Sequence, residues 1–201
     1  MLDPLILRII AVGFALLFLL ASSHKLSNKM QFHGILAAYQ ILPASMLGPV
    51  AVVIPLLELV LGVAWCLTAL MSIQIEFVPM LSAMLLTGYG IVIAVNLKRG
   101  RSYIDCGCGF SSATGGAQNA SDAGGTQQLS SALVFRNFVL ALVALWATTP
   151  ISARDLGLID FLNLALAIIT LVFLYAAFNQ LLINNSAIGA WRNSIKGHAH
   201  D

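Results

Sequence analysis

Apolar residues fill most of the chain in five long runs that are separated by short polar stretches. A helix needs about 20 mostly apolar residues to cross the hydrocarbon core of a bilayer, and about 17 to 25 are acceptable. The runs that meet this length are 5–22, 46–71, 77–97, 133–149 and 159–183. The pattern predicts an all-α integral membrane protein, a bundle of four to five transmembrane helices in a single membrane domain that covers residues 1–201.

The polar stretches between the runs differ in character. After the first run, which we expect to be retained because no small-residue cleavage site ends it, apolar side chains recur at helical spacing in Phe32, Ile35, Leu36 and Tyr39. We expect a short interfacial helix there. The stretch 111–131 consists almost wholly of small and polar residues, a composition that buries too little apolar surface to fold, and we expect a flexible loop.

Composition agrees with a membrane protein. Charged residues make up 9% of the chain and hydrophobic residues 59%, whereas a soluble domain carries about 25% charged residues. The net charge of +2 is small, and the basic residues are scattered along loops. Nucleic-acid binding requires a basic patch on a folded face, so we expect the lipid bilayer and no nucleic acid as a partner.

The basic residues also predict orientation. With five spans, the first connector, the stretch after the third run and the C-terminus share one side, and the positive-inside rule places that side in the cytoplasm. The other side carries Arg154, with Arg8 near the start of the first run. The basic residues of the first side are Lys25, Lys29, Lys98, Arg99, Arg101, Arg192 and Lys196.

Glu58 lies near the middle of the second apolar run. A carboxylate at this depth costs several kcal/mol unless it is protonated, paired or facing a polar cavity. We consider it a candidate proton site. The alternative is a structural ion pair with Lys25, Arg8 or Arg136. Cys66 lies two helical turns further on and is a weaker redox candidate. A lone buried cysteine usually serves only as a small hydrophobic residue.

Cys106 and Cys108 are separated by a single glycine, Gly107. A disulfide requires Cα atoms about 4.4 to 6.8 Å apart, whereas an extended tripeptide places them about 7 Å apart. Glycine permits the bend that closes this gap. The resulting small ring should be strained and easily reduced, which suits an exchange catalyst better than a permanent crosslink. We therefore predict that both cysteines are catalytic.

Charged residues flank the cysteine pair. Arg99, Arg101 and Arg136 would favour the thiolate form, whereas Asp105 opposes it or accepts a proton during exchange. A metal site is the main alternative, but structural zinc and iron–sulfur clusters take four ligands and only two are local. A purely structural loop also stays open. We expect no metal and no resident cofactor; the sequence does not decide whether a quinone accepts electrons.

Several short motifs follow one another in a defined order through the first four runs. They are Ser23-His24-Lys25-Leu26 followed by Phe32 and Tyr39, Leu42-Pro43, Pro55 with Glu58 and Gly62, Arg99-Gly100-Arg101 before Asp105-Cys106-Gly107-Cys108, and Leu129-Ser130 before Arg136-Asn137. In this order and spacing the chain resembles the methylamine utilisation protein MauE family, which is related to DoxX-like membrane proteins.

The resemblance implies a location and a role. It implies a bacterial inner membrane protein that helps to mature the small subunit of methylamine dehydrogenase, a disulfide-rich periplasmic enzyme, together with the thioredoxin-like protein MauD. We predict thiol–disulfide redox chemistry, whether as an oxidoreductase or as a relay. The alternative is a non-redox assembly or translocation factor for that subunit. Cysteines facing the cytoplasm would require a transmembrane relay, whereas cysteines facing the periplasm could exchange with the partner directly.

Overall fold

The computed structural model describes residues 2–71, 75–100, 131–152, 154 and 156–198. This part of the chain is helical apart from short turns and one backbone bridge between Leu2 and Ile151. Four of its helices are long and apolar enough to cross a membrane, and α5 is a shorter apolar helix. The predicted all-α membrane bundle of four to five spans is confirmed. The helices are α1 (Pro4–Ser27), α2 (Lys29–Tyr39), α3 (Ala44–Met71), α4 (Phe77–Lys98), α5 (Ser131–Trp146) and α6 (Leu158–His198).

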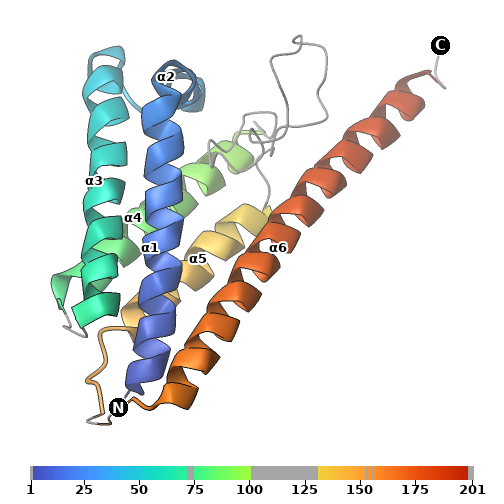
Figure 1. Cartoon of the computed structure of the whole chain (residues 1–201). Coiled ribbons are helices and arrows are strands. Elements are labelled where there is room, and N and C mark those ends of the chain that lie inside the picture. Colours follow the sequence, from blue (N-terminus) through green and yellow to red (C-terminus); the bar gives the residue numbers. More distant parts are fainter. Residues whose placement is uncertain (1, 72–74, 101–130, 153, 155, 199–201) are drawn as a thin grey trace.

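Successive long helices alternate in direction, so the N- and C-termini lie at opposite ends of the bundle (Figure 1). Helix α2 lies across one end, beside the start of α3, and the last turn of α4 and the first turn of α5 lie at this same end (Figure 1). We call it the α2 end, and the opposite end the N-terminal end. The expected short helix after the first span is therefore present.

Local sequence sets several helix ends. The side chain of Asp3 accepts a hydrogen bond from the backbone N–H of Leu5 at 2.8 Å, and Pro4 occupies the first position of α1, where its missing N–H costs nothing. Gln40, which follows the last residue of α2, adopts a left-handed conformation with φ of 49°. Helix α4 ends just before Gly100, whose φ of 72° is favoured for glycine.

The core of the bundle joins α1 and α3 closely. The rings of Phe14 and Trp65 stack with centroids 5.2 Å apart, and Phe18 extends the stack at 6.0 Å from Phe14. Gly62 brings the two helices together, because a Cβ atom there would lie 2.8 Å from Cγ of Leu19. Small residues that permit such an approach are typical of helix contacts in membranes, where packing rather than water exclusion drives association.

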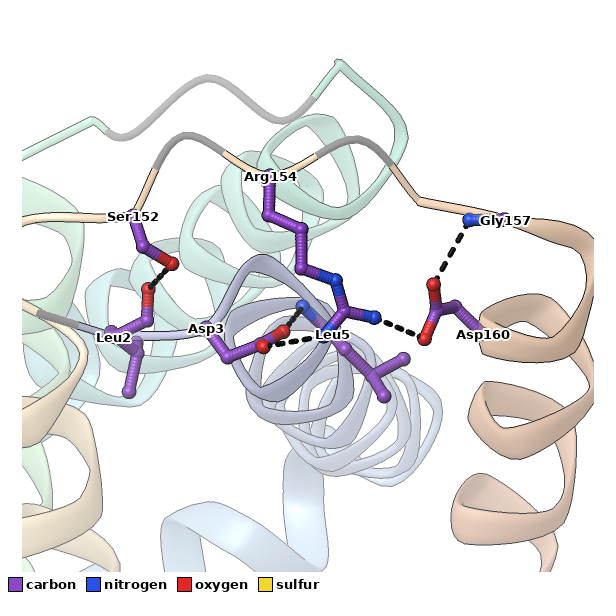
Figure 2. Close-up of polar contacts among 7 residues, drawn as sticks. All are labelled: Leu2, Asp3, Leu5, Ser152, Arg154, Gly157 and Asp160. Carbon is purple, nitrogen blue, oxygen red and sulfur yellow. Dashed lines mark hydrogen bonds and ion pairs between the residues drawn. The ribbon is translucent and has the colours of Figure 1, made fainter.

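At the N-terminal end, polar contacts join α1, the α5–α6 connector and α6 (Figure 2). Arg154 binds the carboxylate of Asp3 at 2.9 Å and that of Asp160 at 2.5 Å. The hydrogen bond with Asp160 is the largest of the effects that raise the pKa of Arg154 above its ordinary value. The backbone N–H of Ser152 also donates to the carbonyl of Leu2 at 2.9 Å. We call Asp3, Arg154 and Asp160 the Arg154 cluster.

Two predicted spans differ from the observed helices. The run 133–149 forms a helix of 16 residues that ends at Trp146; at 1.5 Å per residue it is about 24 Å long, shorter than the hydrocarbon core of about 30 Å. The run 159–183 forms part of a helix that continues to His198, because no proline interrupts it. The expected flexible loop at 111–131 lies outside the described residues, except for Ser131, which begins α5.

Candidate functional site

Three polar side chains from three helices meet inside the bundle. Nζ of Lys25, on α1, lies 2.5 Å from Oε1 of Glu58, on α3. The hydroxyl of Tyr89, on α4, donates a hydrogen bond to the same oxygen at 2.6 Å. Lys25 Nζ also lies 3.3 Å from the Tyr89 hydroxyl oxygen. We call these three residues the polar triad.

The ion pair of the triad is almost completely removed from solvent, whereas Tyr89 is partly buried. The side chain of Glu58 is 1% exposed and that of Lys25 is 8% exposed. Two buried charges are tolerated only when they are paired and hydrogen-bonded, since each loses its hydration. The second carboxylate oxygen of Glu58 has no hydrogen-bond partner among the described residues. This oxygen can accept a proton or a further hydrogen bond.

Of the three cationic partners considered for Glu58, the structure brings Lys25 to it. Lys25 lies in the last turn of α1, where a positive charge also interacts favourably with the carbonyl end of the helix. Arg8 instead lies 5.5 Å from the ring centroid of Phe161 on α6, and Arg136 points to α6 as described below. The structure therefore contains the ion pair between Glu58 and Lys25 that was considered as an alternative. The use of Glu58 as a proton site stays a prediction.

An apolar cavity of about 370 Å³ lies beside the triad at the α2 end. Lys25 and Tyr89 both contribute to its wall. Helix α2 covers it with the buried aromatic rings of Phe32 and Tyr39. The ring of Phe32 also lies 5.3 Å from Lys25 Nζ, within the range of a cation–π contact. The cavity thus combines mostly hydrocarbon walls with a polar inner end.

Tyr89 was not singled out by sequence reasoning. A tyrosine in an apolar run does not by itself indicate a functional site, because its ring is compatible with a membrane span. A usable signal exists, however: Ser82, Tyr89 and Asn96 repeat every seven residues, which places them on one face of α4. Ser82 accepts a hydrogen bond from Nε1 of the buried Trp65 at 2.9 Å, and Asn96 is fully buried.

Two of the arginines predicted to favour the thiolates, Arg99 and Arg136, fall in the described part of the chain, and each contacts another helix end or helix. Arg99 donates to the backbone carbonyl of Gln40 at 3.3 Å and so ties the end of α4 to the end of α2. Arg136 donates to Oδ1 of Asn179 on α6 at 3.1 Å and lies 5.8 Å from the ring centroid of Tyr175. Their predicted effect on the thiols stays a prediction.

Of the remaining predicted site residues, only Cys66 lies in the described part of the chain. Cys66 is a free, partly buried thiol that packs against the apolar core. Among the described residues, no group of three or more His, Cys, Asp or Glu side chains is arranged to hold a metal ion. Arg101, Asp105, Cys106 and Cys108 lie outside the described residues.

The number of long apolar helices, their apolar surface and the buried ion pair of Lys25 and Glu58 together define a multi-pass helical membrane protein with a polar site between its spans. The profile of the family described as "Methylamine utilisation protein MauE" matches residues 3–150. This chain belongs to that family. The matched range includes the triad, Cys106 and Cys108, and it ends before α6.

Individual relatives agree with the family match. A methylamine utilization protein MauE of Paracoccus versutus is 34% identical over 180 residues, which cover 89% of this chain and 88% of the relative. The MauE of Paracoccus denitrificans is 32% identical over 155 residues, covering 76% and 74%. That of Methylorubrum extorquens is 33% identical over 142 residues, covering 71% and 68%. No solved structure matches the chain significantly.

Proposed function

We propose that this chain is a membrane thiol–disulfide redox protein that supports maturation of the methylamine dehydrogenase small subunit together with the thioredoxin-like protein MauD. The family is one of methylamine utilisation. The observation that carries the finer proposal is the Cys106-Gly107-Cys108 sequence, which follows the basic end of α4. Two thiols this close in sequence can alternate between dithiol and disulfide.

The exchange step is an ordinary thiol–disulfide reaction. A thiolate of the partner attacks the disulfide between Cys106 and Cys108, and a mixed disulfide forms. The second partner thiolate then resolves it, so that the partner gains a disulfide and the pair becomes a dithiol. Two electrons and two protons pass to the pair. Arginines near the end of α4 would stabilise the released thiolates.

The polar triad supports this proposal by offering a place for protons within the membrane. Reoxidation of the dithiol releases two protons, and Glu58 has an oxygen that is not hydrogen-bonded within the described residues. Lys25 and Tyr89 hold the carboxylate in one orientation through its other oxygen. We therefore assign Glu58 a proton-transfer role and Lys25 and Tyr89 positioning roles.

Serine variants of the paired cysteines test the proposed function. In a methylamine-grown host, Cys106→Ser and Cys108→Ser should each abolish mature small subunit, measured by immunoblot and by alkylation gel shift of its disulfides. Cys66→Ser is the matched control and should mature the subunit normally. Normal maturation in both paired-cysteine variants would instead support a non-redox assembly or translocation factor.

A further inference from the structure

The cavity next to the polar triad has the features of a small-molecule site. Its volume of about 370 Å³ falls in the usual range for ligand pockets, about 300 to 1,000 Å³. Such sites are mostly apolar with a few convergent polar groups, and here the polar groups are Lys25, Tyr89 and Asn137. We propose that this cavity binds the ring of a membrane-soluble quinone, with a ring carbonyl oxygen accepting a hydrogen bond from Lys25.

Lys25 has a donor to spare for such a ligand. An ammonium group carries three N–H donors. Two are directed at Oε1 of Glu58 and at the hydroxyl of Tyr89. Because Lys25 also lines the cavity, its third N–H donor can reach a carbonyl oxygen placed at the inner end of the cavity. A ligand that offers an acceptor there would complete the hydrogen bonding of the buried ammonium group.

The charge of the site selects against an acidic lipid. Lys25 and Glu58 form an ion pair whose net charge is zero. A fatty-acid carboxylate or a phospholipid phosphate would bring a second anion close to Glu58, and like charges repel strongly in a medium of low dielectric constant. A quinone is neutral and carries carbonyl acceptors on an apolar ring, so it matches both the charge and the walls.

The cavity also opens where a lipid-soluble molecule would enter. It lies between α3 and α4 beneath α2, and its rim includes Met84, which is 69% exposed, and Ile41, which is 40% exposed. Both residues are apolar, which is the surface that a lipid-soluble ligand would meet at the opening. Aromatic rings of Phe32 and Tyr39 line the covered side, and such rings pack well against a flat ligand ring.

Quinone binding is independent of the proposed function, whereas reduction of the quinone by the cysteines rests on it. In that reaction, oxidation of the dithiol of Cys106 and Cys108 to a disulfide releases two electrons and two protons, and reduction of one quinone to a quinol consumes both. No other oxidant is required. The binding itself requires neither cysteine, so the two proposals can fail separately.

A cavity-filling variant tests the binding site. Gly88 lines the cavity, and a Cβ atom added there would meet no atom within 4 Å. Gly88→Leu should therefore fill the cavity without disturbing the helices. Gly48 on α3 is exposed, does not line the cavity and is equally open, so Gly48→Leu is the matched control.

The measurement is equilibrium binding of decylubiquinone to the purified full chain in detergent. Gly88→Leu should weaken binding at least about tenfold, and Gly48→Leu should leave it unchanged. A double variant, Lys25→Met with Glu58→Leu, removes the donor and should also weaken binding about tenfold. Unaltered binding in Gly88→Leu would overturn the proposal.

Competition and cysteine variants separate the remaining explanations. Decanoic acid has a chain of matching length and an anionic head, so it should displace decylubiquinone poorly; equal displacement would mean a general acyl-chain groove and would overturn the quinone assignment. The Cys106→Ser/Cys108→Ser double variant should bind decylubiquinone as the parent chain does. Loss of binding there would overturn the assignment of the site to the cavity.

Discussion

Nζ of Lys25 lies 2.5 Å from Oε1 of Glu58, which joins the last turn of α1 to the middle of α3 by a buried ion pair. The two residues are 33 positions apart in sequence. They come together because Gly62 and Leu19 allow α1 and α3 to pack closely over their length. The pair is therefore a consequence of helix packing, and it also makes that packing specific to one register.

Removing one member of the pair should cost much more than removing both. Lys25→Met leaves the Glu58 carboxylate buried without its counter-charge, and we expect a loss of about 3 to 5 kcal/mol in the free energy of unfolding. Lys25→Met with Glu58→Leu should recover most of that loss. The measurement is denaturant unfolding in detergent micelles, with Lys29→Met on the exposed surface of α2 as the control. Equal stability of the single and double variants would contradict a coupled pair.

Gly62→Ala should destabilise the contact between α1 and α3. The added methyl group would lie 2.8 Å from Cγ of Leu19 and 3.1 Å from its backbone nitrogen, and overpacking of this kind costs about 1 to 3 kcal/mol. Gly13→Ala is the matched control, because nothing lies within 4 Å of its Cβ position. It should be neutral or slightly stabilising. Thermal unfolding monitored by circular dichroism compares the two.

Ser82→Ala should leave the indole N–H of Trp65 buried without its acceptor, which lies at 2.9 Å in the structure. An unsatisfied buried donor costs about 1 to 3 kcal/mol. Ser23→Ala, whose exposed hydroxyl bonds only within its own helix, should change stability little. Both are measured by denaturant unfolding. Ser82→Thr keeps the hydroxyl and should restore stability, and a defect that persists in Ser82→Thr would point to packing rather than hydrogen bonding.

The alternation of the helices predicts which residues share a side of the membrane. In a chain with its three cysteines changed to serine, Met30→Cys places an exposed thiol on α2, and Glu76→Cys places one at the N-terminal end. A membrane-impermeant maleimide should label one of these two introduced cysteines in intact cells and the other cysteine only after lysis. The positive-inside rule predicts that Met30→Cys is the protected one. Equal labelling of both would contradict the helix arrangement.

Hydropathy predicted the helices well because a membrane span must satisfy its backbone internally, so a long apolar run has little choice but to be helical. In 133–149, the shortest run, the helix ends earlier than the run does, at Trp146. The reason lies in the turn that follows, which directs the chain toward Leu2. Hydropathy averaged over a window of neighbouring residues carries no information about this long-range contact with Leu2.

The candidate site could be predicted only in part. Glu58 stood out because a charge in an apolar run needs a partner, and Lys25 was among the partners considered. The choice among three cations depended on how the helices rotate and pack, which the sequence does not state. The cavity depended on α2 covering a gap between α3 and α4, an arrangement that no single segment encodes.

The Arg154 cluster has a consequence for biosynthesis. Asp3 and Arg154 are 151 residues apart in sequence, and Asp160 follows at the start of α6. Asp3 therefore emerges from the ribosome long before either of its partners is made. The cluster can close only after α5 has entered the membrane and the chain has turned back, so a nascent chain halted before Arg154 would hold its first helix without this polar attachment.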